Sequence, residues 1–456
     1  MHKRSFLLSV LIAAVLCLSG GQAQAGHGVF NPQTFTLENG LQVVVLPNHR
    51  VPVVTHMVYY KVGSADEPPG KSGVAHLLEH LMFKGTKERP SGDFSRIVAR
   101  NGGSENAFTS LDFTGYFQTV AADRLELMMG MEADRMVNLI LDPKEVETER
   151  LVVLEERRMR TDNDPGSILG EHVNAALFLN YPYRQPVIGW EHEIKALSVD
   201  ALRAFYQRWY YPGNAILLVA GDITAEQLKP MAERTYGRIP ARPDVARDRP
   251  SEPPQSASRR VELKSERVRQ PSWQRTYLAP TRLTEIKGGA GVEHADALEI
   301  LADVLGGGSS GPLYRSLVIE QKLAISAGAG YRASGMGPGR FVFYAAPRPG
   351  VTIAKLEAAM DAELAKILKN GVADDDVQRA KTRTLAEAVY ALDSLATGAR
   401  IFGSALASGR TIDDVENWPH RIEAVTTEAV NAAARAVIKG RPSVTSLLLS
   451  ADKGGS

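Results

Sequence analysis

The alternation of apolar and polar residues predicts several strands in the first half of the chain. Residues 35–46 are typical of a β-hairpin in which Asn39-Gly40 supplies a two-residue turn. Three further segments are also typical of strands, because they either are apolar or repeat Thr, Phe and Tyr. Additional strands are predicted at 53–62, 104–120 and 215–220.

Helical periodicity and capping residues predict helices between these strands. Ser72 can cap a helix that begins beside it, and Gly85 can end that helix. A stronger start signal is Asp142 at the N-cap with Pro143 directly after it. Further helices are predicted at 124–141 and 199–210.

The second half repeats this rhythm after a Pro-rich segment. Residues 239–256 hold five prolines and several charges, which is typical of a linker. We therefore expect two homologous domains of mixed α and β structure, 26–238 and 259–456, joined by a linker at 239–258. Elements of the second domain are predicted at 260–263, 274–279, 296–305, 324–331, 340–346 and 444–449.

Residues 1–25 are typical of a secretory signal peptide. A basic start ends at Arg4, an apolar run follows at 6–18, and a small-x-small cleavage site ends at Ala25. The alternatives are a membrane anchor, which so short a run disfavours, and a lipoprotein site at Cys17, which a preceding Leu disfavours. We expect export to the bacterial periplasm, with no membrane segment after the signal is removed.

Composition narrows the possible chemistry. Of 456 residues, 44% are hydrophobic and 23% charged, as in ordinary folded proteins, and the net charge of +1 favours neither nucleic acid nor an anionic membrane. The single cysteine leaves with the signal. The mature chain therefore has no disulfide and no thiolate, and any metal must bind to His and carboxylate side chains.

The stretch HLLEH at 76–80 carries the clearest candidate chemistry. On a helix, His76 and His80 share one face and can hold a zinc ion at about 2.0–2.1 Å. Glu79 lies at the edge of that face, within reach of a water on the metal. This order is the inverted form of the zinc-protease motif H-E-x-x-H. With 10 His in the chain, chance alone gives such a match in roughly one chain in a hundred, so the motif needs support.

The helix that Asp142 caps supplies that support. A catalytic zinc site commonly has three protein ligands, and Glu156 is the best candidate for the third. Glu149 lies seven residues before Glu156 and shares its face. The alternative is a solvated acidic face, which suits Glu145, Glu147 and Glu155 better than Glu156, and facing favours Glu156 over its neighbour Glu155 as the ligand.

The chain resembles the pitrilysin/insulinase superfamily of zinc peptidases, and is closest to short bacterial members similar to mitochondrial processing peptidase. The resemblance covers essentially the whole mature chain. It implies two homologous α+β domains, each a mostly antiparallel sheet covered by helices. The segments that carry it are SGVAHLLEHLMFKGT, GGSENAFTS, ERLVVLEERR, YPYRQPVIG and YYPGNAILLVAGD.

The resemblance assigns roles to the residues of the motif and of the capped helix. It makes His76, His80 and Glu156 the ligands of one zinc ion per chain. It makes Glu79 the general base that activates water for attack on a peptide carbonyl. Glu149 becomes a carboxylate that supports a ligand histidine.

The resemblance also implies a substrate-binding strand around Asn106 and Ala107. In such sites an extended peptide adds to the free edge of a sheet through main-chain hydrogen bonds, which tolerates many side chains. The alternative for Asn106 is a simple turn residue. Flexible or unfolded peptides are the implied substrates.

One departure from the family pattern concerns the second domain. Many members place an Arg and a Tyr after a glycine run there, both directed at the substrate. In this chain Pro312 and Ile325 occupy those positions, and Arg315 comes three positions late. We therefore expect the chain to be the zinc-bearing subunit of a heterodimer whose homologous partner supplies the Arg/Tyr pair.

Three functions are compatible with these features. The first is a zinc endopeptidase, which the intact motif favours. The second is a non-catalytic subunit like the core proteins of respiratory complexes, which usually lose the metal residues. The third is a peptide-binding or chaperone module without hydrolysis.

Overall fold

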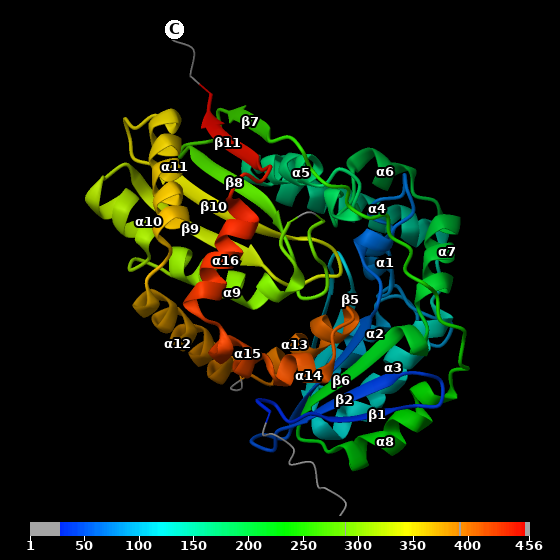
Figure 1. Cartoon of the computed structure of the whole chain (residues 1–456). Coiled ribbons are helices and arrows are strands. Elements are labelled where there is room, and N and C mark those ends of the chain that lie inside the picture. Colours follow the sequence, from blue (N-terminus) through cyan, green and yellow to red (C-terminus); the bar gives the residue numbers. More distant parts are fainter. Residues whose placement is uncertain (1–27, 288, 392–393, 452–456) are drawn as a thin grey trace, which may run out of the picture.

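A computed structural model describes residues 28–451 apart from residue 288 and residues 392–393 (Figure 1). The predicted signal peptide lies outside the described residues. Two β-sheets organise the described chain, one of six strands and one of five. The first sheet contains β1 (Gln33–Thr36), β2 (Gln42–Pro47), β3 (Val53–Tyr60), β4 (Ser104–Thr109), β5 (Thr114–Ala121) and β6 (Ala215–Gly221). The second contains β7 (Arg259–Ser265), β8 (Ser272–Ala279), β9 (Ala324–Arg332), β10 (Gly339–Pro347) and β11 (Val444–Ser450).

Helices cover both sheets. The first half of the chain contributes α1 (Val74–Leu81), α2 (Asp93–Arg100), α3 (Leu125–Asn138), α4 (Pro143–Arg157), α5 (Pro165–Leu177), α6 (Glu191–Ala196), α7 (Val199–Trp209) and α8 (Ala225–Arg234). The second half contributes α9 (Ala295–Gly306), α10 (Pro312–Tyr314), α11 (Ile353–Asn370), α12 (Asp374–Ala391), α13 (Leu395–Ala407), α14 (Ile412–Glu416), α15 (Trp418–Ala424) and α16 (Thr427–Ile438).

The two sheets share one topology. Apart from β1, the first sheet has the order β2-β6-β3-β5-β4 and the second has the order β7-β11-β8-β10-β9. In both, the first and last strands along the chain are parallel, and the other neighbours are antiparallel. The predicted α+β class, with two similar domains built on mostly antiparallel sheets, is confirmed.

The first hairpin is confirmed, but its turn differs from the prediction. The β1–β2 loop contains three residues, 38–40, closed by the Leu37 N–H that donates to the Leu41 carbonyl at 3.0 Å. Gly40 has φ of +87°, a left-handed conformation that glycine adopts without steric cost. Three-residue hairpin loops with a left-handed last residue are a common alternative to the two-residue turn.

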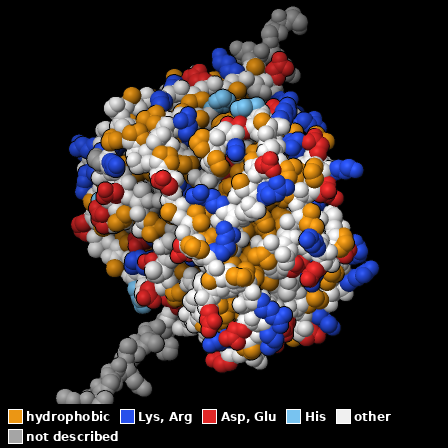
Figure 2. Space-filling model, turned by 90° about the vertical axis from the view of Figure 1, so that its right-hand side faces the viewer, with side chains coloured by type: hydrophobic (Ala, Val, Ile, Leu, Met, Phe, Trp, Pro, Cys, Tyr) orange, Lys and Arg blue, Asp and Glu red, His pale blue; other side chains and the backbone are white. Residues whose placement is uncertain are grey.

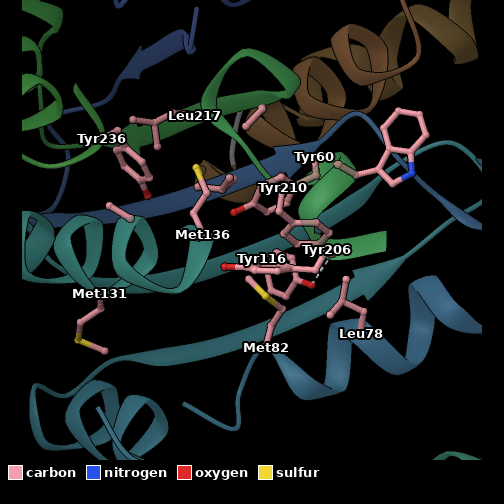
Figure 3. Packing of buried hydrophobic residues seen from close by; sticks show 14 of the residues in the cluster. Tyr60, Leu78, Met82, Tyr116, Met131, Met136, Tyr206, Tyr210, Leu217 and Tyr236 are labelled. Carbon is pink, nitrogen blue, oxygen red and sulfur yellow. Dashed lines mark hydrogen bonds between the residues drawn. The ribbon is translucent and has the colours of Figure 1, made fainter. Parts of the chain in front are cut away.

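The core of the first domain lies between its sheet and the helices α1, α3, α4, α7 and α8. It is rich in tyrosine, and Figure 3 shows Tyr60, Tyr116 and Tyr210 grouped together near Met82, the residue after α1. The hydroxyls of Tyr116 and Tyr210 lie 3.0 Å apart, so their polar ends are satisfied inside the core. The apolar face of α1 is thereby fixed against the sheet.

Each domain contributes a helix that packs on the sheet of the other domain. Helix α13, from the second half of the chain, packs Phe402 and Ala399 on the other face of the first sheet, against Met57 and Leu218. Conversely, α5 from the first half lies against β7, β8 and β11 of the second sheet (Figure 1). Each sheet is therefore covered in part by the other half of the chain.

Residues 240–258 contain no helix or strand, but they pack between the domains. The Arg249 guanidinium lies 2.8 Å from Asp66 Oδ1 and 2.6 Å from Asp112 Oδ1, and all three side chains are nearly inaccessible. Arg247, two residues earlier, reaches the Asp112 carbonyl on the same side. The segment is thus held by buried charge pairs in addition to joining the domains.

We expect Arg249→Met to lower the free energy of unfolding by about 3–5 kcal/mol, because two buried carboxylates lose their cation. Urea denaturation followed by tryptophan fluorescence measures the loss. Arg242→Met, at an exposed position of the same segment, is the matched control and should change stability little. Equal stability of the two variants would show that the buried pairs do not hold the segment.

The surface carries charges of both signs. On the face that Figure 2 shows, Lys and Arg side chains are interspersed with Asp and Glu side chains, in keeping with the small net charge. Among the described helices, none combines the length and the apolar character that crossing a membrane requires.

Candidate metal centre and active site

Helix α1 carries the HLLEH stretch, and its start differs from the prediction. Gly73, with φ of +87°, precedes the helix, and the Glu67 carboxylate accepts hydrogen bonds from the N–H groups of Gly73 and Ala75 at 2.9–3.0 Å. The prediction that Ser72 caps this helix is wrong, because its hydroxyl accepts from the Trp190 N–H. A carboxylate at this end also suits the helix dipole.

The structure brings His76, His80 and Glu156 together. Glu156 Oε2 lies 3.7 Å from His76 Nε2 and 3.3 Å from His80 Nε2. One ligand atom of each residue lies within 4.8 Å of the other two. Two histidines on one helix and a carboxylate from another thus converge on one point.

Helix α4 places both predicted glutamates at this point. As predicted, the Asp142 side chain caps α4 by accepting from the N–H groups of Lys144 and Glu145. Seven residues apart on α4, Glu149 and Glu156 both face α1. Glu149 Oε1 lies 2.9 Å from His80 Nδ1, and its other oxygen lies 2.6 Å from Lys84 Nζ.

Glu155 and Glu156 have different surroundings. Glu155 is half exposed and forms a surface pair with Arg158 at 2.6 Å. Glu156 is 17% exposed, and its second oxygen lies 2.6 Å from Arg160 Nη1. Only Glu156 of this pair lies against the histidines.

Glu79 lies beside the cluster and is hydrogen-bonded to the edge strand. The Thr109 hydroxyl donates to Glu79 Oε2 at 2.5 Å, and the Glu79 side chain is almost fully buried. Burial raises the pKa of Glu79, and the Thr109 hydrogen bond opposes that rise. A carboxylate with a raised pKa in a dry site is a capable proton acceptor and donor.

The two histidines differ in charge preference. Burial, helped by the neighbouring His80, lowers the pKa of His76 to about 4. Burial also acts to lower the pKa of His80, but hydrogen bonds to Glu149 and Glu156 outweigh it and raise that pKa to about 9. A metal ion here would displace the His80 proton, since ligands bind in their deprotonated form.

The donor set fits zinc. Two imidazole nitrogens and one carboxylate are among the ligand sets that catalytic zinc sites use, and they leave a coordination position open. The Glu149 carboxylate accepts at His80 Nδ1, which directs His80 Nε2 toward Glu156 and the common point. A second carboxylate behind a ligand histidine is a frequent companion of zinc.

Asn106 and Ala107 lie on β4, which is the edge of the first sheet. Next to the β4–β5 ladder, the Ser110 N–H donates to the Phe113 carbonyl. Residues whose N–H points to the neighbouring strand alternate with residues whose N–H points away, so the N–H of Ala107 points away from β5. The Asn106 side chain accepts from that N–H at 2.8 Å. Asn106 therefore belongs to an edge strand, and the alternative of a turn residue is wrong.

Several contributors to the site escaped the sequence analysis. The start of α1 is supported by Glu67, Glu149 is supported by Lys84, and Glu79 is supported by Thr109. Each of these contacts depends on tertiary packing. Of these, Lys84 alone had a sequence signal, since it follows His80 at helical spacing.

The residues that replace the expected Arg/Tyr pair all lie in the second domain. Pro312 begins α10, Arg315 follows that helix, and Ile325 is 45% exposed on the edge strand β9. They are not part of the metal-ligating group.

Comparison with known proteins agrees with this geometry. The family model described as "Insulinase (Peptidase family M16)" matches residues 42–190, which include α1 and α4. The model described as "Peptidase M16 inactive domain" matches residues 196–384. The first match covers the candidate metal centre, and the second covers much of the domain without the motif.

Related proteins extend the match to most of the chain. Zinc protease PqqE of Helicobacter pylori is 31% identical over 401 residues, 87% of this chain and 88% of its own. Mitochondrial-processing peptidase subunit beta of Blastocladiella emersonii is 30% identical over 208 residues, 46% of this chain and 44% of its own.

Solved structures show the same fold. A protease from Helicobacter pylori superposes with a TM-score of 0.84 at 29% identity, over 92% of this chain and 99% of that one. The periplasmic protease PqqL of Escherichia coli gives 0.77 at 20% identity, over 92% of this chain and 47% of that one. From these matches, the chain belongs to the insulinase (M16), or pitrilysin/insulinase, family of peptidases.

Proposed function

We propose that the protein is a zinc-dependent endopeptidase that hydrolyses flexible or unfolded peptides. One observation carries this proposal: His76, His80 and Glu156 converge on one point beside Glu79. His76, His80 and Glu156 would hold one zinc ion per chain, and Glu149 would orient His80. When bound, zinc polarises a peptide carbonyl and lowers the pKa of water.

The protein's own groups then move the proton. Glu79 accepts it from the water that attacks the carbonyl carbon, and returns it to the leaving amide nitrogen. The Thr109 hydroxyl, which donates to Glu79 Oε2, fixes the orientation of the carboxylate. Because Thr109 ends β4, it also links the proton-transfer group to the strand that would bind substrate.

The free edge of β4 supports the choice of substrate. A peptide added there would bond to main-chain groups such as the outward N–H of Ala107, replacing the Asn106 side chain. Main-chain recognition requires an extended segment and selects weakly among side chains. Flexible and unfolded peptides supply such segments.

We expect Ala107→Pro to lower kcat/KM about 10- to 100-fold, mainly through KM, because it removes an outward N–H that a peptide would use. The N–H groups that bond to β5 remain, so the sheet should persist. Ala107→Ser, which keeps the N–H, is the control. Unchanged KM in Ala107→Pro would exclude binding along this edge.

The substitutions at Pro312 and Ile325 support a heterodimer in which a homologous partner supplies an Arg and a Tyr. Periplasmic residence is the corresponding proposal for location, supported by the character of residues 1–25.

We expect the mature chain with a co-exported homologue to cleave an unfolded peptide, to lose that activity with a chelator and to recover it with zinc. The partner should raise kcat/KM at least about tenfold, since it completes the substrate contacts. Fluorogenic peptide assays with each chain alone and together measure this. Equal activity of the single chain would contradict the heterodimer, and chelator-resistant activity would contradict the zinc mechanism.

A non-catalytic peptide-binding subunit is the second candidate. In such a subunit, the candidate zinc ligands and Glu79 would all be present but would have no catalytic role. A purified chain that binds peptides, contains no zinc and cleaves none of them with any partner would favour this candidate.

A further inference from the structure

A cavity of about 390 Å³ lies between the two domains, next to the proposed catalytic carboxylate. The end of β4 and the turn after it form one wall, which contains Thr109, Ser110 and Leu111. Arg332 at the end of β9 and Arg340 at the start of β10 form part of the opposite wall. The cavity thus lies between the candidate substrate strand β4 and the second domain.

The charges of this cavity are not balanced. Arg340 donates to the neutral side chain of Asn174 at 2.8 Å, and no Asp or Glu lies among the described residues that line the cavity. Arg332 forms no ion pair within the described part of the chain. Burial lowers the pKa of Arg340, and the positive charge of Arg332 lowers it further, so an anion here would relieve both effects.

Two other arginines in partly buried positions of the second domain are paired with carboxylates. Arg275 contacts Glu357 and Asp361, and Arg282 contacts Asp296 and Glu299. Arg332 and Arg340, by contrast, face one cavity whose described lining contains no carboxylate.

The acidic group that contacts the cavity lining through Tyr183 is already engaged. Tyr183, which lines the cavity, donates its hydroxyl to Asp112 Oδ2 at 2.6 Å, while Asp112 Oδ1 pairs with Arg249. Asp112 therefore does not neutralise Arg332 or Arg340. A bidentate carboxylate from outside would suit the planar guanidinium groups.

The cavity adjoins the path of a peptide on β4. Thr109 both lines the cavity and donates to Glu79, so the cavity begins at the proposed point of cleavage. At about 3.3 Å per residue, a peptide along β4 would reach it within roughly four residues of the scissile bond. An antiparallel peptide would have its N-terminal part there, and a parallel peptide its C-terminal part.

We propose that Arg332 and Arg340 form a pocket for a carboxylate of the peptide substrate, either an Asp or Glu side chain or the C-terminus, so that the enzyme prefers acidic or C-terminal segments at this position. This proposal rests on the proposed peptidase function. It adds a specificity determinant supplied by the second domain of the same chain.

The test uses fluorogenic peptides of one neutral sequence in which a single Glu or Gln is moved along the chain, each with a free or amidated C-terminus. We expect Glu at one position, or the free C-terminus, to raise kcat/KM about tenfold over its neutral counterpart. Arg332→Gln and Arg340→Gln together should abolish this preference, so that the peptide with the carboxylate and its neutral counterpart are cleaved with equal kcat/KM. Arg269→Gln, at an exposed loop position that does not line the cavity, should keep the preference.

Binding separates this proposal from the peptidase function. Fluorescence anisotropy with the same peptides, labelled, and the full mature chain carrying Glu79→Gln should show the same tenfold preference for the carboxylate, also lost in the double Arg variant. If that preference is present but wild-type protein cleaves nothing even with its co-exported homologue, the peptidase function fails and the pocket stands. Equal affinity for acidic and neutral peptides, or binding of neither, overturns the pocket.

Discussion

Replacing Glu79 with Gln is expected to lower kcat/KM for peptide hydrolysis by about a hundred- to ten-thousandfold, the usual contribution of a general base. Zinc content and peptide affinity should stay at their wild-type values. The Gln side chain has nearly the same shape and keeps an oxygen for the Thr109 hydroxyl, but it cannot accept the proton of the attacking water. Steady-state kinetics together with elemental analysis measure both parts.

Glu88→Gln is the control for this prediction, because Glu88 lies on the exposed loop after α1. It should leave kinetics and zinc content unchanged. Activity of Glu79→Gln within tenfold of wild type would remove Glu79 from the chemical step, and loss of zinc in that variant would make it a support of the centre instead.

A second large effect is expected from two neighbouring glutamates on α4. Glu156→Gln should weaken zinc binding more than about a hundredfold and abolish activity, since the loss of a direct ligand should exceed the 10- to 100-fold effect typical of residues behind one. Glu155→Gln should change neither, because Glu155 is a surface residue paired with Arg158. Competition with a chromophoric chelator gives the zinc affinity of each variant.

The comparison of these two variants has a built-in control, since both remove the same charge from adjacent positions. If Glu155→Gln lost zinc while Glu156→Gln retained it, the facing of α4 in the structure would be wrong. If neither lost zinc, the third ligand would come from another residue.

The sequence predicted the arrangement within each helix of the candidate metal centre, because that arrangement obeys local rules. The spacing of His76 and His80 is a property of one helix, and the Asp142 cap sets the phase in which Glu149 and Glu156 share a face. The convergence of the two helices came from the family resemblance, since helical periodicity does not determine which helices pack together.

Features that depend on tertiary contacts escaped prediction. Ser72 was an acceptable cap by residue type, but Glu67 reaches the same N–H groups from the preceding loop. The sequence does not show that α5 and α13 each pack on the sheet of the other domain, because a helix has an ordinary apolar face whichever sheet it covers. The buried ion pairs of Arg249 with Asp66 and Asp112 could not be predicted, because the composition of the segment around Arg249 indicates only a linker.

Anomalous X-ray scattering tests most directly whether His76, His80 and Glu156 hold a zinc ion. Crystals of the purified mature chain, measured on both sides of the zinc absorption edge, should show a peak about 2.0–2.1 Å from the Nε2 atoms of His76 and His80 and at a similar distance from a Glu156 oxygen. A map without a peak at that point, or with zinc held only by other residues, would show that these three side chains are not the zinc ligands.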